Sequence, residues 1–116
     1  MIESQIQDAI RKELGDVRRY PEVVLWPNVC GVFVDERGIK RRVGLANPGG
    51  ADLIGMWTMA DGRALFIALE IKSATGRQRD GQRQFEELVT RRGGVYAVLR
   101  SVEDAQQWAE QMRSKQ

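Results

Sequence analysis

The stretch that decides the fold is Ala64-Leu65-Phe66-Ile67-Ala68-Leu69-Glu70-Ile71-Lys72. Apolar residues fill positions 64–69, which is typical of a strand buried on both faces in the centre of a sheet. The strand then ends in a carboxylate, Glu70, and an ammonium, Lys72. These two groups lie on the same face, roughly 7 Å apart along the strand. Charges at the end of a buried strand are costly unless something holds them there. The other interpretation of this Glu-x-Lys triplet is a strand end that has reached solvent and carries an ordinary ion pair.

The sequence on either side predicts a single domain over residues 1–116. Apolar residues at three- and four-residue spacing predict helices, and β-rich segments between turn residues predict strands. We expect helices over 2–14, over 80–92 and from 101 onward, and strands over 39–43, 51–58, 63–72 and 95–100. Residues 23–34 are β-rich but interrupted by Pro27, Asn28 and Gly31, and residues 35–38 are expected to form a hairpin loop. The order α-β-β-β-β-α-β-α indicates a mixed α/β fold in which helices flank a central mixed sheet.

The turn before the central strand sets its pairing with the preceding strand. If Ala60-Asp61-Gly62 is a three-residue hairpin loop, counting outward from it puts Asp52 directly opposite Glu70. Two facing carboxylates repel each other, so either one takes up a proton or a divalent cation lies between them. With no histidine available, two such acids suit a hard cation such as Mg²⁺ or Mn²⁺. The alternative is that Asp52 only caps the glycine-rich turn over 44–50.

Composition limits the chemistry open to the chain. Its 116 residues are 42% hydrophobic and 29% charged, which predicts a folded globular domain. There is no histidine, which excludes Ser-His-Asp and Cys-His nucleophilic sites and histidine metal ligands. The single cysteine, Cys30, excludes an internal disulfide and fits a reducing cytoplasm. No apolar run approaches the ~20 residues that span a bilayer, and the N-terminus lacks a signal-peptide pattern, so we expect no membrane partner.

Two further polar residues lie on the inward flank of a predicted helix. Glu3 precedes Ile6 and Ile10 by three and seven residues, so it either reaches over the sheet toward a metal or is an ordinary acidic residue at a helix N-terminus. Gln82, on the helix predicted over 80–92, precedes Phe85 by three residues and Val89 by seven. Its side chain either orients a catalytic group or satisfies a nearby backbone group.

Basic residues are clustered although the formal net charge is only +2. Such clusters suit a phosphate backbone, and the alternative for each is a solvated surface. The clusters are Lys40-Arg41-Arg42, then Arg77 with Arg79 and Arg83, and Arg91-Arg92.

Several short motifs follow one another in a characteristic order along the chain. They are Glu3-Ser4-Gln5-Ile6, Gly49-Gly50-Ala51-Asp52-Leu53, Glu70-Ile71-Lys72, Gly76-Arg77, Gln82, Gly93-Gly94-Val95 and Ser101-Val102-Glu103-Asp104. In this order the chain resembles the VRR-NUC family of the PD-(D/E)xK nuclease superfamily, over almost its whole length. One departure is Ala51, where the superfamily name has proline, at a position that shapes the turn.

The resemblance implies a restriction-endonuclease-like core and metal-dependent hydrolysis of DNA. Asp52, Glu70, the Ile71 carbonyl and Glu3 would hold Mg²⁺, for which Mn²⁺ substitutes. Lys72 and Gln82 would complete the catalytic set, and Lys72 would act either as a base or as an electrostatic stabiliser. Phosphate contacts would come from Arg77, Arg79 and Arg83 and from Lys40, Arg41 and Arg42.

Small stand-alone members of the family look like dimeric enzymes that resolve four-way (Holliday) junctions. The resemblance therefore implies a homodimer that acts on branched DNA in the cytoplasm of a bacterium or a phage-infected cell. Two alternatives stay open at this point: a DNA-binding or recombination accessory protein without turnover, and a nuclease for flaps or linear duplex.

Overall fold

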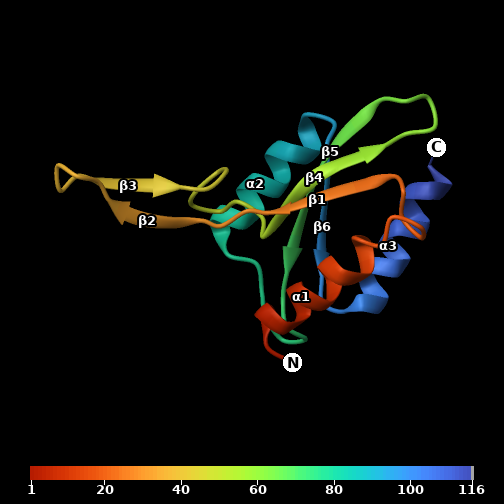
Figure 1. Cartoon of the computed structure of the whole chain (residues 1–116), viewed down its shortest axis with the longest axis horizontal. Coiled ribbons are helices and arrows are strands. Elements are labelled where there is room, and N and C mark those ends of the chain that lie inside the picture. Colours follow the sequence, from red (N-terminus) through yellow and green to blue (C-terminus); the bar gives the residue numbers. More distant parts are fainter. Residues whose placement is uncertain (116) are drawn as a thin grey trace.

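The computed structural model describes residues 1–115 and shows a four-stranded mixed sheet with helices on both faces, from which a separate two-stranded hairpin projects (Figure 1). The sheet order is β1-β4-β5-β6, with β5 and β6 parallel and the other neighbours antiparallel. The elements are α1 (Glu3–Leu14), β1 (Val23–Pro27), β2 (Gly31–Val34), β3 (Lys40–Val43), β4 (Leu53–Thr58), β5 (Ala64–Ile71), α2 (Asp80–Arg91), β6 (Val95–Leu99) and α3 (Val102–Ser114). The expected α/β class and the central mixed sheet are therefore confirmed.

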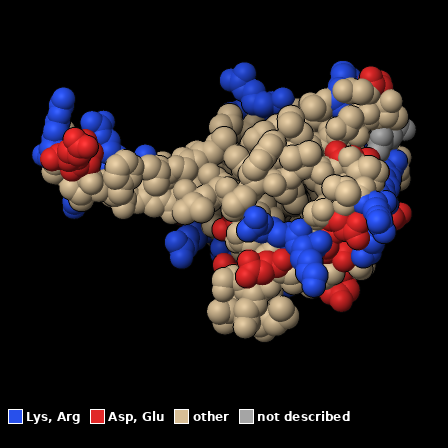
Figure 2. Space-filling view, in the orientation of Figure 1, with Lys and Arg blue, Asp and Glu red and all other residues tan. Residues whose placement is uncertain are grey.

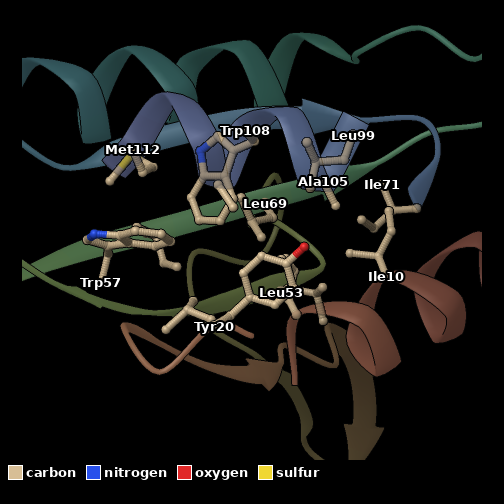
Figure 3. Close-up of a cluster of buried hydrophobic side chains, with 14 of the residues drawn as sticks. Ile10, Tyr20, Leu53, Trp57, Leu69, Ile71, Leu99, Ala105, Trp108 and Met112 are labelled. Atoms are coloured by element: carbon tan, nitrogen blue, oxygen red, sulfur yellow. The ribbon is translucent and has the colours of Figure 1, made fainter. Parts of the chain in front are cut away.

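The main core lies between the sheet and the pair of helices α1 and α3 (Figure 3). Trp57 of β4 and Trp108 of α3 pack edge to face with their ring centroids 5.4 Å apart. Leu69 of β5 and Ile10 of α1 are fully buried in the same cluster. A smaller cluster under α2 covers the opposite face of the sheet, where Phe85 packs with the small residue Ala68 of β5. Burial of these side chains provides most of the driving force for folding.

The strand β5 has the alternation that a central strand requires. Odd-numbered residues from Ile67 to Ile71 face α1 and α3, and even-numbered residues face α2. Every position from Ile67 to Lys72 is buried, but the expected burial on both faces is wrong at the other end of the strand, where Ala64 and Phe66 are exposed. The buried half of the strand is thus the half that carries Glu70.

The predicted order of elements along the chain is wrong in one place, because residues 23–34 form two strands and not one. Pro27 has no N–H for a ladder, and the next residue, Asn28, donates its backbone N–H to the Asp52 carbonyl at 2.8 Å. The chain then leaves the sheet, and β2 pairs with β3 in a hairpin that extends from the body of the protein (Figure 1). We call residues 31–43 the arm.

The glycine-rich loop between the arm and β4 packs against the first turn of α2. Gly49 has a φ of +99°, and a Cβ atom there would lie 2.5 Å from the carbonyl oxygen of Gly81. The two backbones can therefore approach only because position 49 lacks a side chain. Gly38, at the tip of the arm, also has a positive φ, but a Cβ atom there would meet nothing within 4 Å.

We expect Gly49→Ala to destabilise the protein more than Gly38→Ala, by about 1 to 3 kcal/mol. Both substitutions strain a left-handed residue, so their difference isolates the close contact with α2. Urea unfolding followed by circular dichroism measures both. Equal losses in the two variants would mean that the loop moves away from α2 at little cost.

Candidate active site

Asp52 and Glu70 meet at one end of the sheet, in the register expected from the hairpin loop. The ladder between β4 and β5 pairs Leu53 with Leu69, so the residues one step further out face each other. One Asp52 oxygen, Oδ2, accepts the backbone N–H of Ile71 at 2.8 Å. The Asp52 side chain is therefore held by β5, which argues against the interpretation that it only caps the preceding turn.

Glu70 is a buried carboxyl group, with 2% of the residue exposed. Its Oε1 accepts a hydrogen bond from Gln82, and its Oε2 is buried without a hydrogen-bond partner. Burial raises the pKa of Glu70 to about 8, and the neighbouring Asp52 carboxylate raises it further; Lys72 opposes the rise and Glu3 adds to it. At neutral pH in the absence of a cation, the Glu70 carboxyl group is therefore mostly protonated.

Lys72 is buried as well, with 6% of the residue exposed. Its Nζ lies 3.8 Å from Oε1 of Glu70. Its backbone N–H donates to the carbonyl of Leu99 on β6, so the residue is still attached to the sheet. This burial excludes the interpretation of the Glu-x-Lys triplet as an ion pair on a strand end in solvent.

Gln82 has both of the functions that its position suggests. Its Nε2 donates to Oε1 of Glu70 at 2.9 Å, and its Oε1 accepts the backbone N–H of Arg79 at 2.8 Å. One side chain thus caps the N-terminus of α2 and fixes the orientation of the buried carboxyl group.

Glu3 is near the site but does not join the carboxylate pair. Its side chain is close to Gly76, because a Cβ atom built there would lie 3.3 Å from Glu3 Oε2 and 3.4 Å from the stem of Lys72. Within residues 1–115, no three His, Cys, Asp or Glu side chains gather closely enough to hold a metal ion. The structure therefore brings together two acids and one lysine, with Glu3 across the loop that follows Lys72.

The expected phosphate-binding residues are all exposed but lie in two places. Arg77 and Arg79 come shortly after Lys72 in the sequence, and Arg83 is paired with Asp80 in the first turn of α2. The second group, Lys40, Arg41 and Arg42, lies on β3 of the arm, where Arg41 is paired with Asp35.

The base of the arm lies close to the carboxylates. Cys30 is exposed, but partial desolvation of its thiol raises the pKa, and the neighbouring acids Asp52 and Glu70 raise it further. Cys30 therefore stays a protonated thiol beside the site, and it marks where the arm begins.

Two residues that position the site were not predicted from the sequence. Arg100 donates through Nη1 to the carbonyls of Ser73 and Gly76, at 2.6 and 2.7 Å, and so fixes the loop after Lys72. Asn28 donates to the carbonyls of Leu45 and Ala51 and thereby closes the loop that leads to Asp52. The signal for Arg100 was its place after a strand parallel to β5, since such strands end at the same edge of a sheet. For Asn28, the sequence holds no signal beyond its position after a proline.

Comparisons of the chain with protein-family models, with curated proteins and with solved structures found no match. The resemblance to the VRR-NUC family therefore rests on the sequence motifs alone. Among the helices within residues 1–115, none is both long and apolar enough to cross a membrane.

The buried Glu70 carboxyl makes the stability of the metal-free protein depend on pH. The folded protein keeps this proton up to about pH 8, whereas an unfolded chain releases it near 4.5. Between these values the folded state binds the extra proton, so the free energy of unfolding falls as pH rises, by at most about 1.4 kcal/mol per pH unit. We expect Glu70→Gln to flatten this slope in urea unfolding with chelator present.

Glu87→Gln, on the exposed side of α2, is the matched control and should keep the wild-type slope. An unchanged slope in the Glu70 variant would show that this carboxyl group is already ionised at acidic pH, and the protonated state assigned to it would be wrong.

Proposed function

We propose that the protein is a Mg²⁺-dependent DNA endonuclease of the VRR-NUC type, with a PD-(D/E)xK core, that resolves four-way junctions as a homodimer. One observation carries the proposal: a buried carboxyl group faces a second carboxyl group and a buried lysine at the end of a central strand. This arrangement costs free energy in the metal-free protein. Such a cost, at residues that also match a nuclease motif, favours a functional site over a structural ion pair.

The donor set suits Mg²⁺. The unpartnered Oε2 of Glu70 and the carboxylate of Asp52 are hard oxygen ligands, and the Ile71 carbonyl would add a third. Mg²⁺ usually keeps several waters and is bound through one or two carboxylates, so a pair of acids meets its needs. Glu3 would join through a water molecule, because it lies beside Gly76 and apart from the pair.

Bound Mg²⁺ would supply an activated water at neutral pH and would neutralise charge on the scissile phosphate, in a chain that has no histidine. Lys72 would place its ammonium next to the reacting phosphate and stabilise negative charge as it develops. Gln82 would hold Glu70 in a ligating orientation through the bond to Oε1, which leaves Oε2 free. The backbone N–H of Ile71 would hold Asp52 in the same way.

DNA would approach between the two basic groups. Arg77, Arg79 and Arg83 follow the site along the chain, and the arm carries the second group. Contacts of this kind weaken as the salt concentration rises, because binding releases counterions from the DNA. A homodimer is proposed because one such site cuts one strand, whereas resolution of a junction needs two cuts.

The main rival is a DNA-binding accessory protein that keeps the fold without turnover. The burial of Lys72 next to Glu70 favours the nuclease, because binding alone needs neither the carboxylate pair nor a buried lysine. A nuclease for flaps or linear duplex would use the same site, so the choice of substrate rests on the family resemblance.

We expect Asp52→Asn and Lys72→Ala to lower the cleavage rate by at least about 100-fold, because each removes a group that acts on the metal or the phosphate. DNA binding by the Asp52 variant should be retained or tightened, since a charge that repels phosphate is lost. Labelled four-way junctions, flaps and linear duplex, incubated with Mg²⁺ or with chelator, measure the rates, and mobility shifts in chelator measure the affinity.

Asp61→Asn is the matched control, because Asp61 lies in the exposed turn at the opposite end of the β4–β5 hairpin. Wild-type protein that binds the junction but cuts no substrate in Mg²⁺ would favour the accessory protein. Cutting by the Lys72 variant at the wild-type rate would point to a contaminating nuclease.

Metal binding gives a test that does not depend on DNA. We expect Mn²⁺ or Mg²⁺ to raise the Tm of the wild-type protein, and to raise it more at pH 8 than at pH 6, because the cation competes with the proton on Glu70. The Asp52→Asn variant should lose this shift, and Asp61→Asn should keep it. Equal shifts in both variants would place the cation elsewhere.

A further inference from the structure

The arm is a two-stranded ribbon that lacks the packing such a ribbon normally needs. Its strands make extensive contact with each other, and any contact with another helix or strand of residues 1–115 is at most weak. Val32, Phe33 and Val34 are 61%, 50% and 59% exposed. An isolated two-stranded hairpin is marginally stable in water, and exposed apolar side chains of this kind indicate a partner.

The two edges of the arm differ in charge. The outer edge of β3 carries Lys40, Arg41 and Arg42, which is the protection that natural edge strands use against pairing with another chain. The outer edge of β2 consists of Gly31, Val32, Phe33 and Val34, without a charge or a proline. On the face visible in Figure 2, the shaft of the arm is largely uncharged and charged side chains gather at its tip. Only the β2 edge is thus open to pairing.

The register shows which backbone groups on this edge are free. The N–H of Asp35 donates to the carbonyl of Ile39, so these two residues form a hydrogen-bonded pair. Bonded and non-bonded pairs alternate along an antiparallel ladder, which makes the pairs of Val32 and of Val34 with β3 non-bonded. The N–H and C=O groups of both valines therefore point outward from the arm.

We propose that the protein dimerises through β2, which pairs antiparallel with β2 of a second copy. The two-fold axis passes next to Phe33, so Val32 of each copy exchanges backbone hydrogen bonds with Val34 of the other. The two Phe33 side chains face each other across the axis as a non-bonded pair. The result is a continuous four-stranded ribbon with the basic strands at its two outer edges.

A second copy fits this edge better than DNA does. The edge offers alternating N–H and C=O groups and apolar side chains, which another strand matches and a phosphate backbone does not. Pairing through β3 instead would set Arg41 against its own copy, and like charges directly opposite are destabilising. One face of the arm carries the side chains of the paired residues Val32 and Arg42 and of Val34 and Lys40. The four-stranded ribbon of the dimer would therefore present Lys40 and Arg42 of both copies on a single face.

The inference deepens the proposed function, since it locates the surface of the expected homodimer. Its central test is the oligomeric state, which is independent of nuclease activity. The wild-type protein should have the mass of a dimer in multi-angle light scattering. Val34→Pro removes an outward N–H and should raise the dimer dissociation constant at least about 100-fold, because each dimer loses two backbone hydrogen bonds.

Lys40→Pro is the matched control, because Lys40 is opposite Val34 and also points its N–H outward, but from the other edge. It should remain dimeric. Circular dichroism and thermal unfolding check that both variants are folded. A wild-type monomer, or a Val34→Pro variant that remains as dimeric as the wild type, would overturn the proposal.

A covalent test covers the case in which the proline variant fails to fold. In a Cys30→Ser background, Phe33→Cys should oxidise to a disulfide-linked dimer, because residues in a non-bonded pair have Cα atoms about 4.5 Å apart. Arg41→Cys in the same background should stay uncrosslinked. Absence of the crosslink in the Phe33→Cys variant, under conditions that oxidise free thiols, would contradict the pairing.

Junction cleavage separates this proposal from the proposed function. If both hold, Val34→Pro still nicks DNA but makes paired cuts in a junction poorly. Normal paired cutting by this variant would overturn the β2 interface and leave the nuclease intact. A wild-type dimer that crosslinks through position 33 but cuts no DNA would support the interface and overturn the nuclease.

Discussion

Two carboxyl groups, Asp52 and Glu70, are held face to face at the end of a buried strand, and the surrounding structure keeps them there. In the metal-free protein, burial raises the pKa of Glu70 to about 8 and the Asp52 charge adds to the rise, so Glu70 holds a proton that reduces the repulsion between the two groups. Lys72 offsets part of the remaining charge, but it is itself buried. The free energy that this arrangement costs must come from the apolar core on the opposite face of β5.

The supporting contacts come from segments that are far apart in the sequence. Gln82 joins the N-terminus of α2 to Glu70, and Arg100 fixes the loop that follows Lys72. The glycine-rich loop before Asp52 packs on α2 because Gly49 allows the two backbones to touch. Each contact restrains the position of a single group, so the site is fixed by secondary structure on several sides and does not depend on one flexible loop.

Much of this could be predicted from the sequence, because alternation and turn chemistry are local signals. The three-residue turn at 60–62 determined the register, and the register placed Asp52 opposite Glu70. The start of the last helix at residue 101 was also predicted, and Ser101 caps that helix by accepting the backbone N–H of Asp104. The division of residues 23–34 between two sheets could not be predicted, because it depends on the hydrogen bonds that the Asn28 side chain donates to the carbonyls of Leu45 and Ala51. Glu3 was also only partly predictable. Helical spacing indicated which side of the helix carries Glu3, but not how far its carboxyl group lies from Asp52 and Glu70.

Asn28 has a consequence for how the arm and the site move. Its backbone N–H is bonded to the Asp52 carbonyl, and its side chain is bonded to the loop on the other side of the arm. The two chain segments that enter and leave the arm are therefore tied together beside a proposed metal ligand. A displacement of the arm at its base would therefore also displace the backbone of Asp52.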